Sequence, residues 1–240
     1  MPAPSVSSAD ALLAYEAGGY QNVEGWMGEG LFPALRLCAA VQEGFAERGG
    51  AVEIGVHHGK FFIALNQLCL ADEPSLAIDL FEAQHLNVDY SGSGSKQKFQ
   101  ENLKLYCRHQ GRNVQILSAD STVLGPKDIL QRLSMKPRFF SVDGGHTVEH
   151  TINDMCLANE CLSDFGVIFV DDILNPHWLG VIEGVCRYMQ RAPTIVPFAL
   201  TSNKLLFARL SAYKFYLDVF RESGLGQKNV EFFGKTLVAC

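Results

Sequence analysis

Two apolar runs in the second half of the chain end on carboxylates. The run RFFSVDG stops at Asp143, and the run GVIFVDD stops at Asp171 and Asp172. A histidine, His146, follows Asp143 after two glycines. Carboxylate oxygens suit hard divalent cations, and an imidazole can take up a proton near neutral pH. If the fold brings these side chains together, they could hold a cation and act as a general base.

The adjacent pair Asp171 and Asp172 places a condition on such a site. In a straight strand their side chains would point to opposite faces. Both can reach one cation only if the chain bends out of the strand there; otherwise one of them acts through a water or supports the other. Three carboxylates that converge in a partly dry site would repel one another, and a dication would relieve that repulsion. The alternative is that the aspartates cap strand ends and that His146 caps a helix starting near Thr147.

The elements that position these residues follow a regular alternation. Short apolar segments alternate with segments of helical spacing, which predicts a parallel sheet covered by helices on both faces. The predicted strands are 51–55, 75–81, 113–120, 138–144 and 165–172. The tail differs: residues 194–210 predict a hairpin, 211–223 a helix, and 230–240 contain a last strand. We therefore expect antiparallel strands at one edge of the sheet.

The first 50 residues differ from the rest of the chain. Residues 1–10 are rich in Pro and Ser, and residues 11–50 are mainly of helical pattern and end on two glycines. We predict a helical lead-in over 1–50 and one α/β domain over 51–240.

Composition restricts the class of protein. Of 240 residues 48% are hydrophobic and 19% are charged, with a net charge of −6, which favours a well-cored enzyme over a disordered chain. Without a Lys/Arg block a nucleic-acid partner is not expected. Without a signal peptide or a long apolar run we expect no membrane segment. The seven cysteines show no CxxC spacing, and this pattern is typical of free thiols in a cytoplasmic protein.

The first predicted strand and its loop, VEIGVHHGK, carry Glu53, Gly55 and Gly59. The loop is not G-x-G-x-x-G, so the pyrophosphate cradle of that motif is missing. Asp79 lies near the end of the second strand. In doubly wound folds, an acid at about this distance in sequence after the glycine turn accepts hydrogen bonds from the ribose hydroxyls. Asp120, after the third strand, could reach an adenine. These features predict a nucleoside site without a phosphate cradle; ordinary turns and helix caps are the alternative.

The order of these residues resembles the class I S-adenosylmethionine-dependent methyltransferases. The pattern E-x-G-x-x-x-G over 53–59, followed by Asp79 and Asp120, carries the resemblance, which covers roughly residues 50–190. More narrowly, the chain looks like small O-methyltransferases that use a divalent cation, of the catechol and sugar-hydroxyl types. The resemblance implies a Rossmann-like, doubly wound, mostly parallel seven-stranded sheet with an antiparallel C-terminal edge and a helical N-terminal extension.

The resemblance also implies roles for particular residues. Mg²⁺ or a similar cation would be held by Asp143, Asp171 and Asp172. His146 would be the general base, and because the catechol type has lysine there, a sugar acceptor is favoured. The residues expected at the S-adenosylmethionine site are Glu53, Gly55, Val56, Gly59, Asp79, Leu80, Ser118, Asp120 and Asp143.

We therefore expect an enzyme that moves a methyl group to a hydroxyl of a small acceptor, a sugar or a glycosylated metabolite. A homodimer is the expected assembly. The polar segment 82–96 could form a lid over the site. Two alternatives stay open: a metal-dependent hydroxylase or hydrolase on a related fold, and a non-catalytic nucleoside-binding protein.

Overall fold

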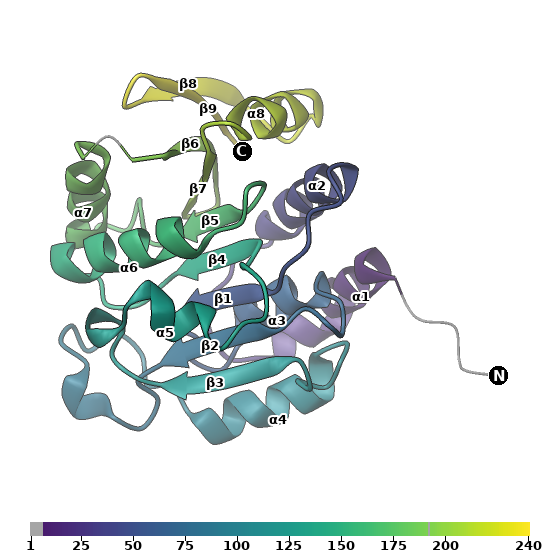
Figure 1. Cartoon of the computed structure of the whole chain (residues 1–240), viewed down its shortest axis with the longest axis vertical. Helices are drawn as coiled ribbons and strands as arrows, with labels where there is room; N and C mark the ends of the chain where they lie inside the picture. The colour runs from purple at the N-terminus through teal and green to yellow at the C-terminus, as the bar shows by residue number, and fades with distance from the viewer. Residues whose placement is uncertain (1–6, 192) are drawn as a thin grey trace.

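The computed structural model describes residues 7–191 and 193–240, which form one nine-stranded sheet with helices on both faces (Figure 1). Residues 1–6 of the predicted lead-in lie outside the described residues. The strands are β1 (Ala51–Ile54), β2 (Ser75–Asp79), β3 (Val114–Ser118), β4 (Phe139–Val142), β5 (Val167–Val170), β6 (Ile195–Thr201), β7 (Lys204–Arg209), β8 (Lys228–Phe232) and β9 (Lys235–Ala239). The helices are α1 (Ser8–Ala14), α2 (Leu31–Gly44), α3 (Lys60–Gln67), α4 (Lys96–Tyr106), α5 (Pro126–Leu130), α6 (Val148–Cys161), α7 (Leu179–Met189) and α8 (Tyr213–Glu222).

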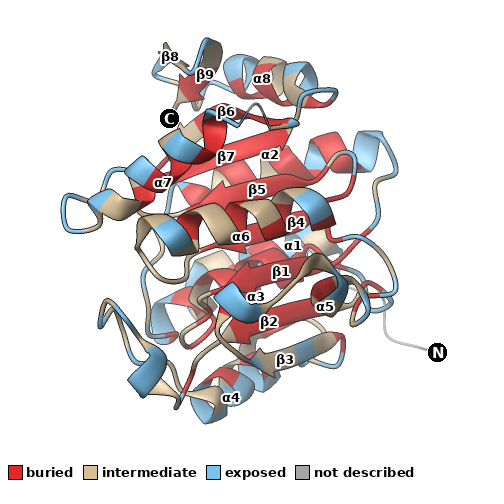
Figure 2. Cartoon of the chain, turned by 60° about the vertical axis from the view of Figure 1, so that its left-hand side comes forward, coloured by how far each residue is buried: buried red, intermediate tan, exposed pale blue. Residues whose placement is uncertain are grey.

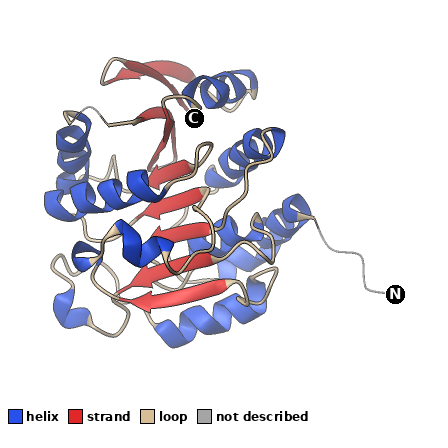
Figure 3. Cartoon of the chain, viewed as in Figure 1, coloured by secondary structure: helices blue, strands red, loops and turns tan. Residues whose placement is uncertain are grey.

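The strand order is β3-β2-β1-β4-β5-β7-β6-β9-β8. Strands β1 to β5 are parallel, and β7 pairs antiparallel with both β5 and β6 (Figure 3). The predicted fold class is confirmed. The sheet has two strands more than the seven that the resemblance implies, and one of these arises because the last segment folds into the hairpin β8–β9 instead of a single strand. Phe233 and Gly234, with φ of 51° and 65°, form its tight turn.

The core consists of two apolar layers, one on each face of the sheet. Because side chains alternate along a strand, Phe139 faces one layer and Phe140 the other, and Phe169 and Ile168 divide in the same way. Helices α1 to α4 and α8 contribute to the first layer, and α5 to α7 to the second. The central strands are buried on both faces (Figure 2). All seven cysteines are free. No helix in the described ranges is long and apolar enough to cross a membrane.

The pairing register aligns the residues that follow the central strands. The last pairs of the ladders are Ile54–Val142, Val142–Val170 and Val170–Leu205. Because β7 runs in the opposite direction, its first residue lies at the edge where β5 ends. One step beyond these pairs, the row across β2, β1, β4, β5 and β7 consists of Asp79, Gly55, Asp143, Asp171 and Lys204. The fold thus places three acids and one lysine along the carboxyl edge of the sheet.

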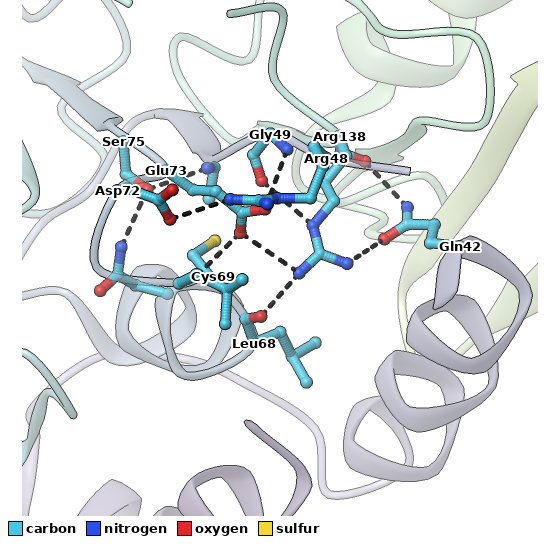
Figure 4. Close-up of polar contacts among 12 residues, drawn as sticks. Gln42, Arg48, Gly49, Leu68, Cys69, Asp72, Glu73, Ser75 and Arg138 are labelled. Atoms are coloured by element: carbon cyan, nitrogen blue, oxygen red, sulfur yellow. Dashed lines mark hydrogen bonds and ion pairs between the residues drawn. The ribbon is translucent and has the colours of Figure 1, made fainter. Parts of the chain in front are cut away.

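At the amino-terminal ends of the central strands, a buried guanidinium, that of Arg138, holds several elements together (Figure 4). It donates hydrogen bonds to the Gly49 carbonyl at 3.0 Å, to Gln42 Oε1 at 2.9 Å and to the Leu68 carbonyl at 2.6 Å. The buried carboxylate of Glu73 lies 3.7 Å from the same group. Arg138 therefore ties α2, the end of α3 and the entry to β1 to the start of β4.

Replacing Arg138 with methionine is expected to lower the free energy of unfolding by ~3 kcal/mol. Three buried acceptors would lose their donor, although Arg48 would still pair with Glu73. Arg187→Ala is the matched control, because Arg187 forms only an exposed pair with Glu183 and should cost less than ~0.5 kcal/mol. Urea denaturation measures the free energy of unfolding of both variants. Equal losses of stability would show that the Arg138 network does not hold the amino-terminal ends of the strands together.

Candidate active site

A cavity of about 760 Å³ opens at the carboxyl edge of the sheet. Its walls come from the segments that follow β1 to β5, from the turn between β6 and β7, and from residues 24–28 of the N-terminal segment. A cavity of this size is typical of sites for small ligands and cofactors. Of the residues predicted to bind a cofactor, Glu53, Gly55, Val56, Asp79, Leu80, Asp120 and Asp143 line it.

The floor of the cavity is the tight turn after β1. Gly55 has a left-handed φ of 84°, and a Cβ added to it would lie 1.8 Å from the Asp143 carbonyl oxygen. Only glycine fits there, because the backbones of two neighbouring strands come into contact. Glu53 is 1% exposed, and its Oε1 has no hydrogen-bond partner in the described part of the chain. Burial raises the pKa of Glu53 well above its usual value, which favours the neutral acid.

Asp79 and Asp120 face the cavity and are also engaged by the protein. Asp79 accepts hydrogen bonds from the backbone N–H groups of His57, at 2.7 Å, and Phe81, at 2.6 Å. Asp120 accepts from the N–H and the hydroxyl of Thr122 at 2.8 and 2.7 Å. Asp120 therefore caps the turn that follows it, as the alternative interpretation expects, and both carboxylates also line the cavity.

Two predicted cofactor residues, Gly59 and Ser118, are not among the lining residues. Gly59 has a φ of 91°, and an added Cβ would lie 2.6 Å from the ring of Phe99. Glycine is thus required there by the packing of α3 against α4. Ser118 ends β3, and Lys96 Nζ lies 3.5 Å from its hydroxyl.

Asp143 and Asp171 share a buried lysine that sequence reasoning did not assign. The ammonium of Lys204 lies 3.1 Å from Asp143 Oδ2 and bonds Asp171 Oδ2. The Lys204 side chain is 1% exposed and its Nζ lies 4.6 Å from the centre of the Phe61 ring. Burial opposes its charge, but the neighbouring carboxylates outweigh that and raise the pKa of Lys204. Lys204 is therefore charged at neutral pH.

Asp172 turns away from Asp171, as the adjacency of the two residues requires. Its φ of 59° takes the chain out of the strand. Its carboxylate accepts hydrogen bonds from the side-chain amides of Asn175 and Asn203, both at 2.8 Å, and lies 2.9 Å from His146 Nε2. The two adjacent acids thus serve different partners, one a lysine and the other a histidine.

The three aspartates predicted to hold a cation therefore do not surround one free point. Candidate ligand atoms of Asp143, His146 and Asp172 lie within 4.8 Å of one another, and Asp171 is not in that group. A dication between Asp143 and Asp171 would have to displace the Lys204 ammonium. The predicted set of three carboxylates does not fit a cation in this arrangement.

His146 is held by carboxylates on both sides of its ring. Asp89 Oδ2 accepts from the His146 backbone N–H at 2.6 Å and lies 2.8 Å from Nδ1, while Nε2 faces Asp172. The indole of Trp178 stacks on the imidazole at a centroid distance of 4.5 Å. Burial lowers the pKa of His146, but the bonds to Asp172 and Asp89 outweigh burial and raise it to about 9. The ring is thus fixed in position and strongly basic.

Asp89 belongs to the segment 82–96, and several residues of this segment line the cavity. An added Cβ at Gly94 would lie 3.0 Å from Asp79 Oδ1, and one at Gly92 would lie 3.7 Å from Trp26. The pKa of Asp89 would be raised by its burial, but hydrogen bonds from His146 and Ser91 lower it. The segment predicted as a possible lid therefore lines the cavity and supplies the partner of His146.

Both a family model and solved structures match this chain. A family model described as a methyltransferase domain matches residues 52–173, half of the chain. No curated protein matches the sequence significantly. Among solved structures, the O-methyltransferase NovP has a TM-score of 0.61 and 17% identity, covering 76% of this chain and 80% of its own.

Two further structures have the same fold. An O-methyltransferase from Bacillus cereus in complex with SAH gives a TM-score of 0.53 at 14% identity, covering 86% of this chain and 92% of that one. CalS11, a TDP-rhamnose 3′-O-methyltransferase of calicheamicin biosynthesis, gives 0.51 at 13% identity, covering 85% and 93%. At these identities the likeness is one of fold.

Proposed function

The chain belongs to the methyltransferase domain family, and on that premise we propose that it transfers a methyl group from S-adenosylmethionine to a hydroxyl of a small acceptor. The observation that carries this proposal is the pairing of two sites in one cavity. Gly55 and Asp79 lie at its floor, and His146 is fixed at its wall between Asp89 and Asp172.

The cofactor is proposed to lie along the carboxyl edge of the sheet. Asp79 would accept the ribose hydroxyls, and Asp120 with Ala119 would line the adenine ring. The methionine part would lie over the Gly55 turn, beside Asp143. The acids of this region outnumber its cations, so the field favours a positively charged sulfonium.

His146 is the proposed general base. When the ring is neutral and its Nδ1–H donates to Asp89, Nε2 can accept the proton of a hydroxyl that takes the place of its 2.9 Å contact with Asp172. When bound, S-adenosylmethionine supplies a methyl group on a sulfur that leaves with the electron pair of the broken bond. His146 passes the proton to solvent after the transfer. The remaining residues act by positioning and by charge.

A sugar or glycosylated metabolite is the proposed acceptor. Histidine rather than lysine stands at the base position, which is the pattern of the sugar-modifying relatives. The cavity wall near His146 carries several amide and hydroxyl groups, those of Asn87, Ser91, Asn175 and Asn203, which suit a ligand rich in hydroxyls. CalS11, named as a TDP-rhamnose 3′-O-methyltransferase, has the same fold.

Magnesium stays a prediction of the sequence and is not part of this proposal. Asp143, His146 and Asp172 are the residues near the base that could hold a cation, which would lower the pKa of a hydroxyl bound to it. A cation there would occupy His146 Nε2, the atom that the proposal uses to accept the proton. No step above depends on it.

Methyl transfer is expected to rise with pH. The pKa of His146 is about 9, so the protonated ring, which cannot accept a proton, dominates below that pH. The ratio kcat/KM, which reports the free enzyme, should increase ~tenfold per pH unit on the acid side and level off above about pH 9. A ratio that falls between pH 7 and 9 would contradict the assignment of His146 as base.

The acceptor class is tested by transfer of a tritiated methyl group. Purified enzyme is incubated with labelled S-adenosylmethionine and, in separate reactions, with nucleoside diphosphate sugars, aryl glycosides and catechols. Label is expected in the sugar-containing products as an alkali-stable methyl ether. Label in the catechol alone would overturn the sugar assignment, and label on nitrogen would overturn O-methyl transfer.

A further inference from the structure

The arrangement of Lys204 supports an inference that goes beyond the proposed function. This inference rests on the proposed function. We propose that Lys204 supplies, from within the chain, the positive charge that a bound dication would otherwise place between Asp143 and Asp171. Transfer by this enzyme then needs no divalent cation. Lys204 is a positioning residue in this account, since its ammonium contacts the carboxylates and not the reacting atoms.

The fold itself brings the lysine to this point. The pair Val170–Leu205 closes the ladder between β5 and β7, so the next residues along the two strands, Asp171 and Lys204, lie opposite each other. The pair Val142–Val170 places Asp143 on the other side of Asp171 in the same way. The position of the ammonium thus follows from the register of three strands and not from a flexible surface chain.

The surroundings of Lys204 hold its ammonium in place. The side chain is 1% exposed, and the ring of Phe61 lies against the ammonium on the side of α3. Glu53 lies behind it and is buried. A cation between the two aspartates would have to expel this lysine into an apolar wall, where its charge would lose both partners.

The charges near the site leave little for a dication to neutralise. The Lys204 ammonium contacts the carboxylates of both Asp143 and Asp171 and so offsets negative charge between them. Asp172 already has His146 and two amide donors. An added dication would also repel the singly positive sulfonium of the cofactor.

The test is a gain of cation binding on removal of the lysine. Lys204→Gln keeps a similar volume but leaves Asp143 and Asp171 without their ammonium. Calorimetric titration with Mn²⁺, without any cofactor, is expected to show no binding to the wild type and one site per chain in the variant. The melting temperature of the variant should rise when Mn²⁺ is added, and that of the wild type should not.

Lys60→Gln is the matched control. Lys60 lines the same cavity, but its ammonium lies over the ring of Tyr20, at 5.2 Å from the centroid, and not between the aspartates. This variant should gain no Mn²⁺ site. A gain in both variants would show that the effect does not come from the Lys204 position and would overturn the proposal.

Two other results would overturn it. One is a wild-type chain that binds one Mn²⁺ and loses methyl transfer when chelator removes the ion. The other is a folded Lys204→Gln chain that binds no Mn²⁺. If Lys204→Gln does not fold, the wild-type titration alone decides. Because none of the binding measurements uses turnover, they stay readable if S-adenosylhomocysteine fails to bind, which would count against the proposed function instead.

Discussion

His146→Ala is expected to reduce kcat for methyl transfer by ~10²–10⁴-fold, the usual contribution of a positioned general base. The affinity for S-adenosylhomocysteine should change little, because the imidazole contacts Asp89, Asp172 and Trp178, none of which is among the residues proposed to bind the cofactor. A loss in kcat with an unchanged cofactor Kd is the signature of a group that acts in the transition state.

His177→Ala serves as the control for this experiment. His177 is exposed and is not among the residues that line the cavity. Its removal should leave kcat within about twofold of the wild type, the range of a neutral surface change. An equal loss in the two histidine variants, or full activity of His146→Ala at saturating acceptor, would show that His146 is not the base.

Asp89→Asn is expected to lower kcat by ~10–10³-fold, because an amide at this position can hold the imidazole in the wrong tautomer. Asp89 is also one of the carboxylates that raise the pKa of His146. Its loss should lower that pKa, so the rise of kcat/KM with pH should begin at lower pH than in the wild type. Rate measurements from pH 6 to 10 would show both effects.

A merely structural role of Asp89 would give a different result. The segment 82–96 would loosen, KM for the acceptor would rise, and the pH profile would keep its wild-type position. Asp164→Asn is the control for the loss of one carboxylate, since the Asp164 side chain is 86% exposed and lies 3.9 Å from Arg209. It should change neither kcat nor the profile.

Much of the fold could be predicted because its signals are local. Each of the first five strands is a short apolar run, and each is followed by a segment of helical spacing, which is enough to indicate a parallel sheet. Gly55, Asp79 and Asp143 end such runs, so their meeting at one edge follows from the rule that the carboxyl ends of parallel strands lie together. The cavity at that edge contains all three.

The partners of the predicted acids could not be predicted in the same way. Lys204 reaches Asp171 only through the register of an antiparallel strand that joins the sheet 33 residues later in the chain. Asp89 reaches His146 across 57 residues from an irregular segment. Neither register nor the path of a long loop is encoded in a periodic pattern, so the predicted site contained the carboxylates without the groups that neutralise them.

A glycine pattern does not say by itself what requires the missing side chain. Gly59 matches the second glycine of the E-x-G-x-x-x-G pattern, but its missing side chain makes room for Phe99 of α4. The pattern shows that a side chain would clash there, and it does not show whether a ligand or a neighbouring helix is the cause. Only the packing of α3 against α4 decides this.

Calorimetric titration of the wild-type chain with S-adenosylhomocysteine tests the central claim most directly. The account predicts one site per chain, with the same affinity in EDTA and in Mg²⁺. Asp79→Asn should bind ~10–100-fold more weakly, because a carboxylate that accepts the ribose hydroxyls is lost. Absence of binding to the folded wild type, or equal binding to Asp79→Asn, would contradict a nucleoside cofactor at the carboxyl edge of this sheet.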